Sequence, residues 1–288
     1  MRATWVGAGA ILLWAFLAVL GRVAAAVPPL ELVALGFCLS GCVGVGWLTA
    51  RGELAVLRQS GWAWAHGVGG LFLYHALFFY ALAHAPAAVA NLLNYLWPLL
   101  IVVFAAPILG LRLGARHIAG MGLAVTGCVL LLGGPVTFQS GAVVGYAAAV
   151  SAAVVWALYS VLARRYFAAV PSSCLAGFCL VTGVLAGLGH FMFETNVVPG
   201  FAASGALILL GLGPLGAAFM LWDWGMKRGD PRLLGTLAYI TPVASTGLLV
   251  AFGFVAASGW LFIAAGLVAL GGLLAASTPS RLSTTPAR

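Results

Sequence analysis

Ten long apolar stretches follow one another along this chain, and they constrain its fold more than any other feature. Each is long enough to cross the hydrocarbon core of a membrane as a helix and carries almost no charge. Nothing in them alternates like the strands of a barrel, and lipid offers the backbone no partners, so helices are the expected spans. These spans are residues 5–26, 31–49, 62–83, 87–110, 117–133, 141–163, 173–193, 203–226, 232–253 and 258–276.

The placement of charge supports this count and excludes other classes of protein. Only 6% of the residues are charged, whereas a soluble protein carries about a quarter. The net charge of +8 does not indicate a nucleic-acid partner, because ten spans place 12 of the 13 Lys and Arg on one face and only Arg22 on the other. Basic residues stay on the cytoplasmic side of short loops. Both termini are therefore expected in the cytoplasm.

The chain contains an internal repeat. The stretch N-Y-L-W-P from Asn94 to Pro98 reappears half a chain later as A-Y-I-T-P from Ala238 to Pro242. Similar residues also surround Trp14 and Trp156, again about half a chain apart.

The repeat predicts an all-α integral membrane protein of ten transmembrane helices in two five-helix units. The expected units are residues 1–140 and 141–276, followed by a disordered cytoplasmic tail, 277–288. Because each unit holds an odd number of spans, the second is inverted relative to the first. Inverted repeats are the plan of many secondary transporters.

Two patterns that suggest cofactors or metals lack the required context. Residues 211–216 match G-x-G-x-x-G, but that fingerprint requires a preceding strand in a soluble βαβ unit. Cys38 and Cys42 share a helix face, but no further Cys or His spacing resembles a zinc site. We expect neither a cofactor nor a metal.

A polar stripe on the fourth span is the first candidate for a substrate site. Asn91, Asn94, Tyr95 and Pro98 are spaced i, i+3, i+4 and i+7, which is one face of a helix. Polar groups that face lipid are costly, so the stripe is expected to face protein or a water-filled cavity. The alternative is that the two Asn side chains only bond neighbouring helices.

The ninth span carries the matching Tyr239 and Pro242. Each proline removes a backbone hydrogen bond, which is expected to free the carbonyls of Asn94 and Ala238 and to allow a bend. Paired interruptions at equivalent positions indicate the central site of a transporter. We interpret Pro98 and Pro242 as hinges and Tyr239 as a substrate contact, with structural kinks as the alternative.

Aromatic residues fall into two groups. Trp14, Trp97 and Trp156 lie deep within spans, where their indole N–H groups need partners or a cavity to line. Tryptophans near span ends are interpreted as interfacial anchors; these are Trp5, Trp47, Trp62, Trp64, Trp222, Trp224 and Trp260.

The third span adds a further aromatic face. Tyr74 and Phe78 lie one turn apart, with His75 beside them. Together with Tyr95 they are candidates for an aromatic-lined pocket; the alternative is ordinary packing. No carboxylate lies at mid-membrane, which favours facilitated transport, and His75 is the only candidate proton site.

The ten spans, two repeats and these motifs resemble the drug/metabolite transporter superfamily, specifically its EamA-type members. Within it, the Trp14 helix, the cluster from Tyr74 to Tyr80, the Asn94–Pro98 stretch and Trp156 are similar to the YddG-type aromatic amino acid exporters. The resemblance implies export of aromatic amino acids from a bacterial inner membrane. The partners it implies are that small-molecule substrate and membrane lipid, without nucleic acid, and a monomer is compatible with it.

Two other classes of function are disfavoured. An integral membrane enzyme would need clustered carboxylates or metal ligands, and His66, His75 and His84 are spaced by nine residues, which alternates helix faces. A channel would need an open polar lining or a filter sequence. The deep aromatic residues argue against such a lining.

Overall fold

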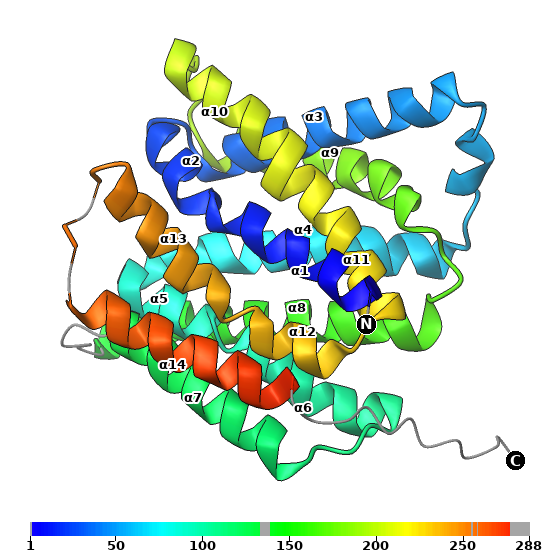
Figure 1. The fold of residues 1–288 in the computed structure, drawn as a ribbon. Helices are drawn as coiled ribbons and strands as arrows, with labels where there is room; N and C mark the ends of the chain where they lie inside the picture. The colour runs from blue at the N-terminus through cyan, green and yellow to red at the C-terminus, as the bar shows by residue number, and fades with distance from the viewer. Residues whose placement is uncertain (1, 133–138, 255, 258, 277–288) are drawn as a thin grey trace, which may run out of the picture.

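The computed structural model describes residues 2–132, 139–254, 256–257 and 259–276, and these residues form helices joined by short loops (Figure 1). The predicted tail, 277–288, lies outside the described residues. The α-helices are α1 (Arg2–Ala15), α2 (Leu17–Val23), α3 (Pro29–Ala50), α4 (Gly61–His84), α5 (Ala87–Asn94), α6 (Trp97–Leu109), α7 (Ala115–Leu132), α8 (Val143–Tyr166), α9 (Leu175–Phe193), α10 (Phe201–Leu212), α11 (Ala218–Arg228), α12 (Pro231–Leu237), α13 (Ile240–Ala251) and α14 (Gly259–Ala276).

Shorter turns complete the fold. The segments η1 (Leu54–Leu57), η2 (Ser140–Ala142) and η3 (Ser172–Cys174) are 3₁₀ turns, and η4 (Gly213–Ala217) is a π-helical turn.

Within the described residues, eight helical segments are long and apolar enough to cross a membrane. They are Arg2–Val23, Pro29–Ala50, Gly61–His84, Val89–Leu109, Ser140–Tyr166, Ser172–Phe193, Phe201–Arg228 and Pro231–Ala251. Each matches one of the expected stretches within a few residues. The remaining two stretches, 117–133 and 258–276, correspond to the helices α7 and α14.

The two proline-containing spans are broken near their middles. Pro98 is the second residue of α6 and Pro242 the third residue of α13. A proline in the first turn of a helix removes an N–H group that has no helical partner there, so each proline marks the start of a new helix. The predicted positions of both interruptions agree with these breaks.

Tighter backbone bonds bridge the two breaks. Leu96 N donates to Leu93 O at 3.2 Å, and Tyr239 N donates to Thr236 O at 3.3 Å, both three residues back. The expectation that the Ala238 carbonyl is free is wrong. It accepts a bond from Thr241 N at 3.0 Å, because the chain turns in 3₁₀ fashion before α13 begins.

Helices distant in sequence pack side by side. The most extensive contacts join α3 with α9, α7 with α14, α4 with α8 and α1 with α11, and Figure 1 shows α7 and α14 lying together along one edge of the bundle. Glycines permit this closeness: a Cβ atom added to Gly7 of α1 would lie 2.7 Å from the Cα atom of Gly225 in α11. Small residues at helix contacts are typical of membrane proteins.

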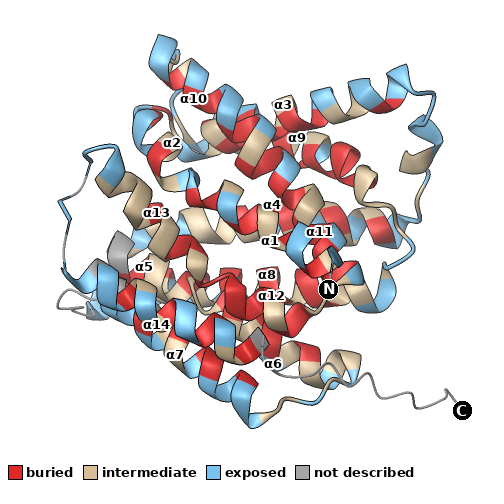
Figure 2. Ribbon diagram, viewed as in Figure 1, coloured by how far each residue is buried: buried red, intermediate tan, exposed pale blue. Residues whose placement is uncertain are grey.

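The outer surface is apolar. Figure 2 shows exposed residues along the outward faces of the peripheral helices, and these include bulky apolar side chains such as Phe191 and Phe201, which are 80% and 99% exposed. Monomeric water-soluble proteins rarely expose so much apolar surface. Lipid covers it in a membrane protein, which agrees with the apolar spans.

Candidate functional site

Three tryptophans that are far apart in sequence meet at the centre of the bundle. Trp14 of α1, Trp97 at the start of α6 and Trp156 of α8 are each at most 6% exposed. The Trp14 ring centroid lies 6.2 Å from that of Trp97 and 5.8 Å from that of Trp156, with the ring planes steeply inclined. Such edge-to-face arrangements are favourable between aromatic rings. The structure thus brings together all three tryptophans predicted to lie deep.

Two further aromatic residues complete this group, and sequence reasoning missed both. Trp222 was expected to be an interfacial anchor, which is wrong: it is 1% exposed, and its ring centroid lies 5.2 Å from that of Trp14. Phe219 lies 5.7 Å from Trp14 and 5.5 Å from Trp156. Phe219, Trp222 and Met226 follow an i, i+3, i+7 pattern, a signal that could have placed them on a buried helix face. Trp14, Trp97, Trp156, Trp222 and Phe219 are called the tryptophan cluster below.

The aromatic face of α4 adjoins the tryptophan cluster. The Tyr74 ring centroid lies 5.2 Å from that of Trp156, and Phe78 stacks on Tyr74 with planes 5° apart. His75 is buried: its Nδ1 atom lies 2.7 Å from Leu71 O, and its ring meets Phe37 edge-on at 5.0 Å. The three predicted α4 residues therefore lie together, with His75 held by its own helix and by aromatic neighbours.

A polar pair lies beside these rings. Asn94, the last residue of α5, is 5% exposed, and its Nδ2 atom donates to the phenolic oxygen of Tyr74 at 3.2 Å. Its Oδ1 atom is buried and accepts no hydrogen bond from the residues that the structure describes. A buried acceptor without a donor is costly, so this oxygen is suited to a ligand that brings one.

The predicted polar stripe crosses the break between α5 and α6. Asn91 and Asn94 lie on α5, Tyr95 follows its end, and Pro98 lies in the first turn of α6. Asn91 and Tyr95 are half-buried. The polar members of the stripe therefore lie at the end of α5, and Pro98 lies across the break in α6.

Tyr239 lies apart from the tryptophan cluster. It is 1% exposed and packs with Ala124 of α7 and Val268 of α14, next to the half-buried Tyr95. Pro242 is buried in the first turn of α13. The two tyrosines of the repeated motif therefore share one apolar cluster beside the break, away from the tryptophans.

Charged groups gather where α8 and α11 end. Lys227 Nζ lies 2.8 Å from Asp223 Oδ2 and donates to Val170 O, and Ser172 Oγ donates to the same carboxylate oxygen at 2.6 Å. Arg164 donates to the carbonyls of Met226 and Gly229 at the end of α11. This network ties α8, α11 and the loop before α9 together.

A second ion pair lies just beyond, between α11 and α12. Arg232 Nη2 lies 2.8 Å from Asp230 Oδ2, and Arg232 also donates to Arg112 O. Burial acts to raise the pKa of Asp230, but the hydrogen bonds and charge of Arg232 hold it below its ordinary value. The carboxylate therefore stays ionised and caps the first turn of α12.

The opposite end of the bundle is fastened by carboxylates. Glu194, after α9, accepts bonds from the backbone N–H groups of Leu30 and Glu31 in the first turn of α3. His190 Nδ1 lies 3.0 Å from Glu194 Oε2, and Glu31 in turn accepts a bond from Val197 N. An anion at a helix start satisfies unpaired N–H groups, so these contacts join α3 to the end of α9.

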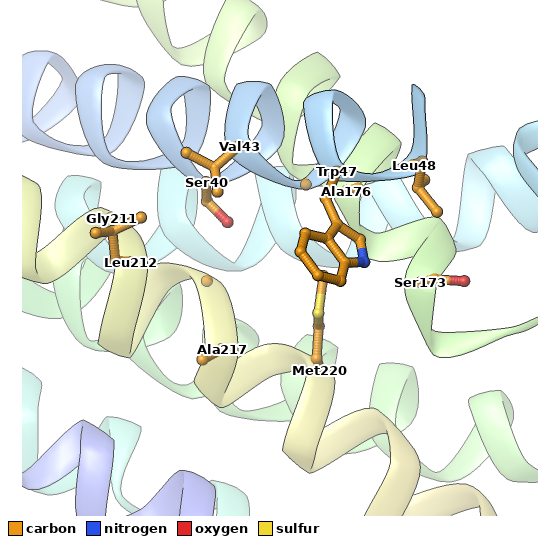
Figure 3. A pocket seen from close by; sticks show the side chains of 12 residues that line it. Ser40, Val43, Trp47, Leu48, Ser173, Ala176, Gly211, Leu212, Ala217 and Met220 are labelled. Carbon is orange, nitrogen blue, oxygen red and sulfur yellow. The ribbon is translucent and has the colours of Figure 1, made fainter. Parts of the chain in front are cut away.

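A groove of about 350 Å³ lies elsewhere, between α3, the start of α9, η4 and α11 (Figure 3). Its lining is mostly apolar, and Figure 3 shows the indole of Trp47 reaching across it towards Met220. None of the predicted site residues lines it. We assign the candidate site to the tryptophan cluster and the Asn94–Tyr74 pair, because most of the predicted site residues and a buried carboxamide oxygen meet there.

Metal-binding geometry is not found in the described part of the chain, where no three His, Cys, Asp or Glu side chains are placed to hold an ion. The site as described consists of neutral groups: indole rings, a phenol and a carboxamide. Such groups bind by stacking and by hydrogen bonds.

Comparisons with known proteins agree with a transport site. The EamA-like transporter family model matches residues 1–133 and 143–277. The chain is 50% identical over 277 residues to the aromatic amino acid exporter YddG of Ancylobacter novellus, an alignment that covers 95% of this chain and 96% of the relative. The exporter of the same name from Salmonella typhimurium is 26% identical, with 86% of this chain and 87% of the relative covered. A solved crystal structure superposes with a TM-score of 0.91 at 50% identity, covering 96% of this chain and 97% of the other.

Proposed function

The chain belongs to the EamA-like transporter family, and on that premise we propose that it exports aromatic amino acids and related amphiphilic metabolites across a bacterial inner membrane. It is a membrane transporter and not an enzyme. Relatives that are similar over most of their length carry the name aromatic amino acid exporter.

The observation that carries the proposal is the contact between the tryptophan cluster and the Asn94–Tyr74 pair. The rings provide stacking surfaces for an aromatic side chain. The Asn94 Oδ1 atom, buried without a donor among the described residues, is placed to accept a bond from the ammonium group of an amino acid. Charge-assisted bonds of this kind are about twice as strong as neutral ones.

We further propose that ten spans form two inverted five-helix repeats. The family model matches one stretch in each half of the chain. The helix packing has the expected two-fold pattern: the pair α1–α11 corresponds to the pair α8–α4, while α3–α9 and α7–α14 each correspond to themselves. The breaks before α6 and α13 occupy equivalent positions in the two halves.

The proposed orientation places both termini in the cytoplasm, because 12 of the 13 basic residues then face it. The ends of α8 and α11 with their ion pairs are then cytoplasmic, and Glu31 and Glu194 are external. Transport would proceed by alternating access, with the chain bending at Pro98 and Pro242.

The transport is proposed to be facilitative. No carboxylate lies at mid-span in the sequence, and the buried Asp223 is paired with Lys227 near the end of its span. His75 is the residue that could contradict this, because it is the histidine predicted nearest the middle of a span. The alternative is an exporter of other small metabolites or drugs, with or without proton coupling.

Uptake into proteoliposomes tests the proposal. Purified protein is supplied with labelled Phe, Tyr and Trp, with Leu and Ser as aliphatic and polar comparisons, and with or without a pH gradient. We expect downhill flux of the aromatic amino acids that is insensitive to proton ionophores. A preference for the aliphatic or polar amino acids would contradict the substrate assignment.

The coupling is decided in the same vesicles. Uphill accumulation driven by an imposed pH gradient, and lost in His75→Ala, would show that the transporter is proton-coupled. His84→Ala is the matched control, because His84 lies at the exposed end of the same helix.

A further inference from the structure

The π-helical turn η4 interrupts the span formed by α10 and α11. The backbone N–H of Ala218 donates to Gly213 O, five residues back, where an α-helix would use Pro214 O. Pro214 has no N–H to offer the carbonyl four residues before it, and Gly213 leaves helical geometry with φ −92° and ψ −93°. The turn therefore releases the Pro214 carbonyl from the bond that Ala218 would make in an α-helix.

The indole of Trp14 uses this released carbonyl. Its Nε1 atom donates to Pro214 O at 3.0 Å, across 200 residues of sequence, and the bond is buried. Figure 1 shows α1 running beside α11, which brings the two residues within reach. An indole N–H buried without a partner would be costly, so the bond fixes which way the ring points.

The ring held in this way is one of two, with that of Trp156, that contact every other member of the tryptophan cluster. Trp14 contacts all four other members, with ring centroids between 5.2 Å and 6.2 Å away. Its N–H points to the helix backbone, so its carbon edges and faces meet the neighbouring rings. The span that the proposed repeat makes equivalent, α4, runs from Gly61 to His84 as one helix without such a turn.

We propose that the η4 turn positions Trp14 for substrate binding, so that Pro214 sets the shape of the aromatic site without touching the substrate. This inference rests on the proposed function and deepens it. Pro214 acts as a positioning residue through its carbonyl, and Trp14 is the group it positions.

The test combines Trp14→Phe and Pro214→Ala in a double-mutant cycle, with labelled phenylalanine uptake into proteoliposomes. An alanine at position 214 restores a backbone N–H, which favours a regular α-helix. In that helix the carbonyl of residue 214 would accept a bond from Ala218 N–H and would no longer be available to Trp14. We expect each single variant to raise KM about fivefold, the worth of one hydrogen bond, with little change in kcat. The double variant should show no larger KM than the weaker-binding single variant, because both changes break the same bond.

Tyr74→Phe provides the matched control. Tyr74 belongs to the candidate site, but its hydroxyl accepts a bond from Asn94 Nδ2 at 3.2 Å and not from the η4 turn or Trp14. Its effect on KM should multiply with that of Pro214→Ala, as expected for independent sites. Multiplying effects of Trp14→Phe and Pro214→Ala would overturn the proposal, as would a Pro214→Ala variant with the KM of the unaltered protein.

A spectroscopic measurement shows, independently of transport, whether the Trp14 indole N–H is hydrogen-bonded. The ultraviolet resonance Raman difference between the unaltered protein and Trp14→Phe isolates the Trp14 indole, and its N–H marker band should show a strong hydrogen bond. A free indole in that spectrum overturns the proposal even if Pro214→Ala does not fold. If the unaltered protein carries no aromatic amino acid, the proposed function fails, while this spectrum still decides whether the turn holds Trp14.

Discussion

The amide nitrogen of Asn94 lies 3.2 Å from the phenolic oxygen of Tyr74, and this bond joins the end of α5 to the aromatic face of α4. It uses the donor side of the carboxamide and leaves the buried Oδ1 atom available. The pair therefore presents an acceptor next to a set of rings.

Removing the Asn94 acceptor is expected to weaken substrate binding more than removing the Tyr74 hydroxyl group. Asn94→Ala should raise KM about tenfold, because a bond to a charged donor is worth about 1.5–3 kcal/mol. Tyr74→Phe keeps the ring and should raise KM about threefold, the worth of a weaker neutral bond. Tyr80→Phe, on an exposed part of the same helix, is the control in labelled-substrate uptake. Equal effects from all three variants would contradict this role for Asn94.

The deep aromatic residues are expected to be needed for transport. Trp156→Ala and Trp97→Ala should each lower uptake at least about tenfold, since each removes a stacking surface and leaves a cavity. Trp260, which is 61% exposed on α14, serves as the control, and Trp260→Ala should transport normally. Amounts of protein in the membrane are measured alongside; normal transport by both deep variants would place the site elsewhere.

The two prolines are expected to control the rate of the transport cycle. Pro98→Ala and Pro242→Ala each supply an N–H at a helix break, which favours one continuous helix over two. Turnover should fall several-fold with KM nearly unchanged. Pro107, which lies inside α6 away from the break, gives the control Pro107→Ala. A change in KM alone would indicate direct substrate contact at the prolines.

The ion pair between Asp223 and Lys227 is expected to stabilise the fold only as a pair. Lys227→Met leaves a buried carboxylate without its cation, which should cost about 3–5 kcal/mol. Adding Asp223→Asn should recover much of that loss. The exposed Arg51–Glu53 pair is the control, and Arg51→Ala should cost less than about 1 kcal/mol. Thermal unfolding in detergent measures the stability of the three variants and of the unaltered protein. A double variant less stable than Lys227→Met would contradict the expectation.

The proposed orientation is tested by labelling introduced cysteines from outside the cell. A cysteine replacing Asn196, in the loop after α9, should react with a membrane-impermeant maleimide. A cysteine replacing Gly114, before α7, should react only after the membrane is opened. External labelling at position 114 would contradict the ten-span arrangement.

The apolar spans and their interruptions could be predicted because both are local properties of the sequence. Length and apolarity decide whether a segment crosses lipid, and proline acts within one turn of its own position. The breaks before α6 and α13 follow from Pro98 and Pro242 alone. The backbone bonds to carbonyls three residues back could not be predicted. The same residues are compatible either with a free carbonyl or with a tightened turn in which that carbonyl is bonded.

The tertiary neighbours of the site residues could be predicted only in part. Trp14, Trp97 and Trp156 had to be buried, but nothing local indicated that they would meet. Trp222 was assigned to the membrane surface because it lies near the end of its predicted span. The charges of Asp223 and Lys227 pair in the fold, so the helix can carry Trp222 into the core.

The contact of α1 with α11 also bears on how the chain is made. Gly7 meets Gly225 and Trp14 meets Pro214, so the packing of α1 depends on a helix synthesised about 200 residues later. Until then, the glycine face of α1 has no protein partner, and its indole N–H has no carbonyl to bond. Contacts this distant in sequence form slowly and leave early segments open to wrong pairings. The α1 helix can therefore reach its final packing only after α11 has been synthesised.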